Sequence, residues 1–166
     1  MSDFTTDPFT QVYDKLWAIL EANTGFTALV KKGNRIKLSG DKEDPIKKQI
    51  SDADTPEVLL TVTGGELYQR RTSTLSLHTK QYSFVVTTGT LRVNKKLFPI
   101  EWAIMRAFDS SLDKNLGLTF VTGFRPGNSR WIIDDDPQMR GRLGWIARID
   151  FDVTFSILNA DLQYKT

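Results

Sequence analysis

The chain has 166 residues, of which 40% are hydrophobic and 25% are charged. This size and composition suit one globular domain over residues 1–166 and exclude wholesale disorder. The 22 Lys and Arg residues are interleaved with 20 Asp and Glu residues, so the formal charge of +2 gives no argument for a nucleic-acid surface. The chain has no cysteine, which excludes disulfides, thiol nucleophiles and cysteine-ligated zinc.

The first predicted element is an amphipathic helix that begins after Asp7, a good N-cap, with Pro8 at its first position. Asn23-Thr24-Gly25 is typical of a helix end. A short helical turn at 26–30 and a brief edge strand at 35–38 follow. The apolar stripe of the helix has a period of 3.6 residues and consists of Phe9, Val12, Tyr13, Leu16, Trp17 and Leu20.

The middle of the chain predicts strands. Residues 39–56 are rich in Gly, Pro and charged side chains, and they indicate a long surface loop. An alternating pattern begins at Glu57, and Gly64-Gly65 indicates a turn or a bulge within it. Between 75 and 86 the apolar residues change parity, which predicts either a hairpin near Thr79-Lys80 or one long strand with a bulge there.

The C-terminal half predicts a second helix from about Pro99 to 112 and a strand at 116–120. Residues 123–143 contain Gly, Pro, three aspartates and four arginines, and they indicate a second long loop. The alternation from Trp145 to Ile157 predicts an antiparallel strand with one face on the core. Because strands and helices do not alternate regularly, we expect an α+β domain. Its antiparallel sheet would have four to five strands, with two main helices packed on one face.

The sequence offers little catalytic chemistry. His78 is the only histidine, and a lone histidine in a strand pattern is usually exposed or half-buried. Asp134-Asp135-Asp136 lacks the ligand spacing of a calcium loop, so an exposed acidic loop tip is the simpler interpretation. No motif matches a phosphate-binding or dinucleotide-binding loop. We therefore expect no catalytic residue, cofactor or metal, and a protein that is not an enzyme.

Interaction with other proteins is the better-supported expectation. Arg125, Arg130, Arg140 and Arg142 flank the three aspartates, and complementary charges on one segment can fix the register between subunits. Trp131 lies beside Arg130, a pairing favoured at interface hot spots, although packing beneath the loop explains Trp131 equally well. Arg35 and Lys37 lie on the predicted edge strand, which a neighbouring chain could extend.

The order of elements resembles the small phage tail-completion proteins, namely the tail terminator (gpU-like) group and its minor-tail relatives. The resemblance covers most of the chain, but the two long loops have no residue-by-residue match. It rests on the segments "VYDKLWAILEAN", "GFTALVKKGNRIKL", "PEVLLTVTGG", "QYSFVVTTG", "FPIEWAIMRAF" and "GWIARIDFDVTFSI".

This resemblance implies a ring-forming homo-oligomer, commonly a hexamer, that caps the tail tube and offers a surface to which the head joins. Its partners would be itself, tail-tube proteins and head-completion proteins, without a membrane or a primary nucleic-acid contact. We expect it in the cytoplasm of the host bacterium during assembly and then in the virion tail. One alternative is a non-viral bacterial protein-binding module of the same fold. Another is a small enzyme that uses His78 or Asp134–Asp136.

Overall fold

The computed structural model describes residues 7–37, 56–88, 94–109, 115–134 and 144–159. The predicted loop at 39–56 lies outside these ranges except for Pro56. The elements in chain order are α1 (Pro8–Ala22), α2 (Thr24–Leu29), the 3-10 turn η1 (Lys32–Asn34), β1 (Arg35–Lys37), β2 (Glu57–Arg71), β3 (Leu75–Thr87), α3 (Leu97–Asp109), β4 (Val121–Asp134) and β5 (Gly144–Leu158).

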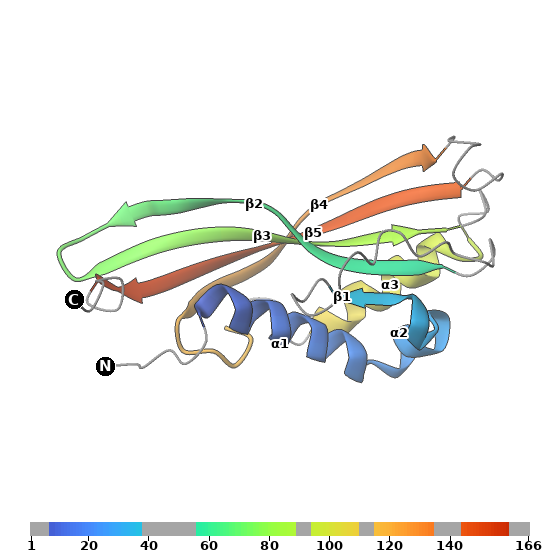
Figure 1. The fold of residues 1–166 in the computed structure, drawn as a ribbon, viewed down its shortest axis with the longest axis horizontal. Helices are drawn as coiled ribbons and strands as arrows, with labels where there is room; N and C mark the ends of the chain where they lie inside the picture. Colours follow the sequence, from blue (N-terminus) through green and yellow to red (C-terminus); the bar gives the residue numbers. More distant parts are fainter. Residues whose placement is uncertain (1–6, 38–55, 89–93, 110–114, 135–143, 160–166) are drawn as a thin grey trace.

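One five-stranded sheet runs through the described residues in the order β1-β2-β3-β5-β4 (Figure 1). The pairs β2–β3, β3–β5 and β5–β4 are antiparallel, which confirms the α+β class. The prediction of a purely antiparallel sheet is wrong at its edge, because β1 pairs with β2 in parallel. Residues 38–56 are long enough for the crossover connection that a parallel pair needs. Three helices accompany the sheet, where two main helices were expected.

Side-chain caps set the bounds of α1 and α2 as the sequence predicts. The Asp7 carboxylate accepts hydrogen bonds from the Thr10 amide at 2.8 Å and from the Thr10 hydroxyl at 2.7 Å. Burial alone would raise the pKa of Asp7, but these hydrogen bonds outweigh it and lower that pKa. Asn23 ends α1 and also caps α2, since its side chain accepts from the Phe26 amide at 2.8 Å.

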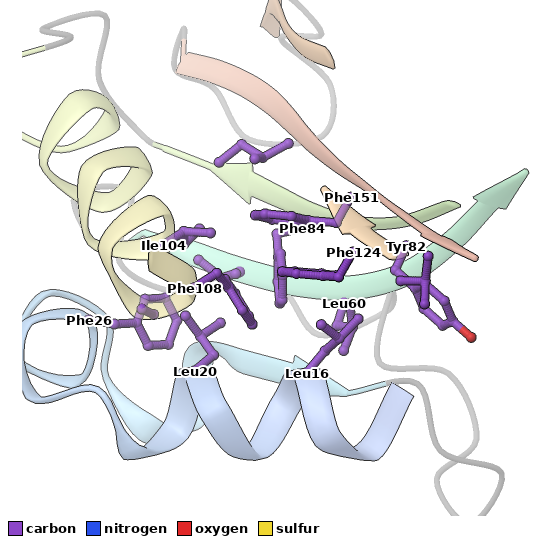
Figure 2. Packing of buried hydrophobic residues seen from close by; sticks show 14 of the residues in the cluster. Leu16, Leu20, Phe26, Leu60, Tyr82, Phe84, Ile104, Phe108, Phe124 and Phe151 are labelled. Atoms are coloured by element: carbon purple, nitrogen blue, oxygen red, sulfur yellow. The ribbon is translucent and has the colours of Figure 1, made fainter. Parts of the chain in front are cut away.

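The core joins the helices to the sheet through a cluster of aromatic rings (Figure 2). Phe151 of β5 lies at its centre: its ring centroid is 5.0 Å from that of Phe108 in α3 and 5.3 Å from that of Phe124 in β4. Two tyrosines add polar links, because Tyr13 donates to the Leu60 carbonyl at 2.7 Å and Tyr82 donates to the Phe9 carbonyl at 2.9 Å. These contacts fix α1 across β2 and β3.

The predicted loop at 123–143 is wrong for its first part, which is strand β4. β4 pairs with β5 from Val121 to Asp134, with register shifts between Val121 and Gly123 and between Pro126 and Ser129. Since β4 is an edge strand, it tolerates a proline and a bulge that an inner strand would not. The strand predicted at 116–120 does not form. Turns lead into β4 there, and Leu116 and Gly117 have φ values of 56° and 74°.

β3 is one unbroken strand, and the connection to β2 lies at 72–74, before the predicted hairpin near Thr79-Lys80. The change of parity has a different cause. Ser76 and His78 face the core together with Tyr82, whereas Leu75 is exposed. Gly64-Gly65 is a bulge in β2, one of the two alternatives that the sequence allowed. Since His78 is buried, the expectation that it is exposed or half-buried is wrong.

Candidate functional site

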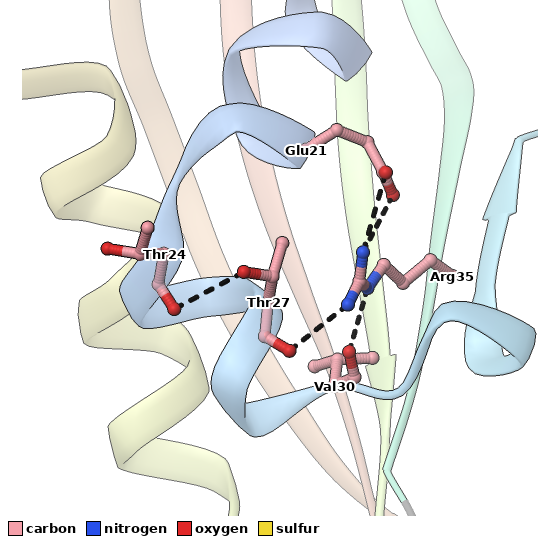
Figure 3. Close-up of polar contacts among 5 residues, drawn as sticks. All are labelled: Glu21, Thr24, Thr27, Val30 and Arg35. Carbon is pink, nitrogen blue, oxygen red and sulfur yellow. Dashed lines mark hydrogen bonds and ion pairs between the residues drawn. The ribbon is translucent and has the colours of Figure 1, made fainter.

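Arg35 of β1 is held by the N-terminal helices (Figure 3). Its Nε donates to the Val30 carbonyl at 2.7 Å, and Nη2 donates to the Thr27 carbonyl at 3.0 Å. Nη1 lies 3.4 Å from the Glu21 carboxylate. The guanidinium thus binds the last carbonyls of α2 to the end of α1 and positions β1 against β2. The Arg35 side chain is only 10% exposed, so a partner chain could reach little of it.

Lys37, the other candidate on β1, forms an ion pair with Asp14 and lies over the Tyr13 ring at 5.6 Å from its centroid. The lysine side chain is partly exposed. A neighbouring chain could therefore reach its ammonium group, although the contacts with α1 already neutralise it. Exposed ion pairs of this kind contribute little to stability, about 0–1 kcal/mol.

The candidates on β4 are more accessible. Arg125 and Arg130 are exposed, and they lie opposite Asp152 and Arg148 of β5. Trp131 is 48% exposed. The backbone of Asp134 ends the strand. Asp135, Asp136, Arg140 and Arg142 lie outside the described residues.

Trp131 belongs to a larger apolar surface, which we call the aromatic surface and define as Leu29, Phe98, Trp102 and Trp131. The Trp131 ring meets Phe98 edge-on at 6.3 Å between centroids, and Phe98 is also 48% exposed. Trp102 lies one helical turn after Phe98 and is 66% exposed. Trp102 and Leu29 line a groove of about 460 Å³ between α2 and α3, together with Gly25, Pro99 and Ala103.

A second apolar surface lies at the far end of the sheet, which we call the distal arm. It comprises Val62–Arg71 of β2, the start of β3 and the end of β5, and it extends beyond the start of α1 (Figure 1). Leu67 is 61% exposed and Tyr68 is 50% exposed, and Leu75 and Leu158 are also exposed. Sequence reasoning missed this surface because these residues fit an ordinary strand pattern.

A bulge in β2 explains why Leu67 and Tyr68 project. The register moves from Glu66 opposite Thr79 to Arg70 opposite Leu77. The three β2 residues between Glu66 and Arg70 therefore lie opposite a single residue of β3, His78. Tyr68 has a φ of 57°, the left-handed region that non-glycine residues rarely occupy. Its amide donates to Nδ1 of His78 at 3.2 Å, and its ring lies 4.8 Å from the imidazole. His78 therefore supports the bulge.

The sheet also carries a polar network on β5 and β3, and it serves the fold. Asp150 is buried and accepts from the Ser83 hydroxyl at 2.5 Å and from Nη2 of Arg148 at 3.0 Å. Nε of Arg148 lies 3.0 Å from Oδ1 as an ion pair without hydrogen-bond geometry. A Cβ added at Gly127 would be 3.4 Å from both the Cβ and the carbonyl oxygen of Asp150, so the β4 bulge packs closely over this residue.

The described residues thus define an α+β sheet domain with two separate exposed apolar surfaces, and no helix among them is long and apolar enough to cross a membrane. The same fold occurs in a chain of the "Virion of native gene transfer agent (GTA) particle", with a TM-score of 0.55 and 10% sequence identity. That match covers 87% of this chain and 94% of the other. No protein-family model and no curated protein matches the sequence at a significant level.

Proposed function

We propose that this chain is a structural assembly subunit of a phage or prophage tail, acting as a tail terminator, a minor tail protein or a head–tail joining protein. In this proposal it works by binding other protein copies in a ring-forming homo-oligomer, and it catalyses no reaction. The observation that carries the proposal is the fold match to a virion chain over nearly the whole length of both chains.

The exposed surfaces support the proposal independently of that match. Soluble monomers rarely leave several large aromatic side chains together in water, and such patches mark interaction sites. Here Phe98, Trp102 and Trp131 share one surface, and Leu67 and Tyr68 share another. A ring needs two different surfaces per subunit, because each copy contacts one neighbour on each side.

The proposal is tested by measuring the mass of the purified chain in solution. Light scattering after size-exclusion chromatography, over a hundredfold range of protein concentration, should show an oligomer with a defined number of copies. Negative-stain electron microscopy of that fraction should show closed rings. A chain that remains a monomer or a dimer at every concentration would contradict the ring and favour a binding module.

The tail role needs a second measurement, since many unrelated proteins form rings. Purified tail tubes from the same genome should bind the ring at one end, and their length distribution should stop changing when the ring is added. An equal amount of an unrelated ring protein serves as the control. Rings that never bind a tube end would remove the tail assignment while leaving the oligomer intact.

A further inference from the structure

The distal arm and the aromatic surface lie at opposite ends of the long axis of the molecule (Figure 1). The arm is formed by the bulged part of β2 and the strands beside it. The aromatic surface lies on α2, α3 and β4. Because the long axis of the sheet separates them, the arm of one copy cannot cover its own aromatic surface. Among the residues that the structure describes, none covers either surface, since the side chains that define both are exposed.

The two surfaces differ in shape. The bulge opposite His78 leaves Leu67 61% exposed and Tyr68 50% exposed near the end of the β2–β3 pair, with one side of the Tyr68 ring packed against the imidazole. At the aromatic surface the exposed side chains border a hollow, because α2 and α3 leave a groove of about 460 Å³ beside Trp102 and Leu29. This volume lies in the range of pockets that hold a ligand or a few side chains.

The exposed aromatic side chains have the area expected at the apolar centre of an interface. At roughly 200 Å² for each aromatic side chain, the exposed parts of Phe98, Trp102 and Trp131 present on the order of 300 Å² of apolar surface. Leu29 and the groove add to this. A standard interface buries about 800 Å² on each partner, and its apolar centre is smaller than the whole. The aromatic surface therefore matches the centre of such an interface.

We propose that the distal arm of one copy docks on the aromatic surface of the next copy, with Leu67 and Tyr68 entering the α2–α3 groove beside Trp102. The inference rests on the proposed ring and names its contact. A second copy is the occupant because one repeated contact then covers both surfaces of every subunit. Since the two surfaces differ, the contact is head-to-tail. Both surfaces of every subunit are covered when the ring closes, whereas an open chain of subunits leaves one surface uncovered at each end.

Local strain at the arm fits this assignment. Tyr68 holds a left-handed backbone conformation that is unfavourable for a non-glycine residue, and such strain concentrates at sites that bind. The His78 imidazole holds the Tyr68 amide in place before any partner arrives. An arm that is ordered in advance loses less conformational entropy when it docks.

Complementation between two variants tests the contact. The arm variant carries Leu67→Ser and Tyr68→Asn, since asparagine tolerates the left-handed conformation. The groove variant carries Leu29→Gln and Trp102→Gln, two exposed helix positions where glutamine is a good helix former. Each variant alone should lose at least about 30-fold in self-association. An equimolar mixture should form a 1:1 dimer and nothing larger, because only one intact contact remains.

The controls separate folding from binding. Ala18→Gln, on the exposed face of α1, should assemble like the unchanged chain. Circular dichroism and thermal unfolding should show that both double variants keep the fold. Rings that survive either variant, or a mixture that stays monomeric, overturn the inference and leave the proposed ring standing. An unchanged chain that never assembles overturns both.

Cross-linking gives a second measurement that preserves the apolar residues. Since the chain has no cysteine, Glu66→Cys on the arm and Arg106→Cys beside the groove each introduce a single thiol. A bismaleimide should join the two variants in a mixture and should not join either variant to itself. Cross-linking between two Arg106→Cys copies would indicate a symmetric dimer and contradict the head-to-tail contact. An Ala18→Cys variant mixed with the Glu66→Cys variant is the negative control.

Discussion

His78 has a buried environment that its place in the sequence did not reveal. Only 3% of its surface is exposed, and both ring nitrogens have partners. Because the Tyr68 amide donates to Nδ1, the proton of the neutral ring lies on Nε2, which donates to the Ser76 hydroxyl at 2.8 Å. Burial lowers the pKa of His78. The ammonium group of Lys80 lies nearby, over the Phe9 ring that meets His78 edge-on.

These contacts predict that the chain loses stability in mild acid. The pKa of His78 is lower in the folded chain than its unfolded value of 6.5, so the unfolded chain binds a proton first as the pH falls below about 6.5. Stability should therefore decrease from pH 7.5 to pH 5.5 in urea unfolding experiments. His78→Asn keeps an acceptor for the Tyr68 amide and cannot titrate, so its stability should change less over that interval. An equal change in both chains would assign the effect to other groups.

The β2 strand owes its shape to two irregularities, and the first depends on Gly65. This residue has a φ of 148°, and a Cβ there would lie 2.3 Å from the Thr79 carbonyl oxygen and 2.9 Å from the Lys80 Cα. Both are backbone atoms of β3, which cannot move aside as a flexible side chain could. Glycine is thus required for β2 to stay paired with β3 through the bulge.

Gly65→Ala should cost about 2–3 kcal/mol, because alanine adds both the clash and an unfavourable φ. Gly64→Ala is the matched control: the nearest atom to its added Cβ is the flexible Gln81 Oε1 at 4.0 Å. That substitution should change stability by less than about 0.5 kcal/mol. Urea unfolding of the two variants measures the difference. Equal effects would mean that the bulge adjusts to a side chain at Gly65.

The aromatic cluster ties β5 to its neighbours, and Phe151 is the residue on which most of it depends. Phe151→Ala should cost about 3–5 kcal/mol, because it removes a fully buried ring and leaves a cavity among Phe84, Phe108 and Phe124. Thr154→Ala on the opposite face of β5 should cost much less. Thermal or urea unfolding of both variants checks the prediction. A loss below about 1 kcal/mol for Phe151→Ala would show that the cluster repacks.

Periodicity predicted the elements that have one clean apolar face. The α1 stripe and the alternation of β5 both appear in the structure close to their expected bounds. β4 was missed because Gly123, Pro126 and Gly127 resemble a loop, and only pairing with β5 makes this segment a strand. The core-facing side of β3 was missed because it includes two polar residues, Ser76 and His78, which are hydrogen-bonded to each other. A search for alternating apolar residues does not detect such a pair.

The exposed surfaces were the hardest feature to predict. Trp131 and Arg130 were expected at an interface, and Trp131 is indeed exposed. Trp102 was expected to widen the core stripe of the second helix, but it is exposed, while Ile100, Ala103 and Ile104 of that stripe are buried as expected. The sequence did contain a signal for this surface, namely two large apolar residues four positions apart, Phe98 and Trp102, outside the core stripe. A helix that is apolar on two sides usually has two partners. Leu67 and Tyr68 required the bulge to be known.

At the scale of the whole molecule, the long sheet keeps the two apolar surfaces apart. β2, β3 and β5 each span 13 to 15 residues, and the helices lie toward one end of them (Figure 1). The arm is therefore free of helices, while α2, α3 and β4 form the aromatic surface at the other end. A shorter sheet would bring the surfaces together, and one chain could then cover both of them itself.

Trp131→Ala combined with Arg130→Glu should weaken self-association and leave the monomer folded. Both side chains are exposed on β4, and Trp131 packs only edge-on against the half-exposed Phe98, so the core loses little. Truncation of an interface tryptophan typically costs 2 kcal/mol or more of binding free energy. Because assembly stabilises the folded state by mass action, the unfolding temperature of the unchanged chain should rise with concentration. The variant should show a constant unfolding temperature over the same range, close to that of the dilute unchanged chain. A variant that unfolds even when dilute would place this part of β4 in the core and make the interface assignment wrong.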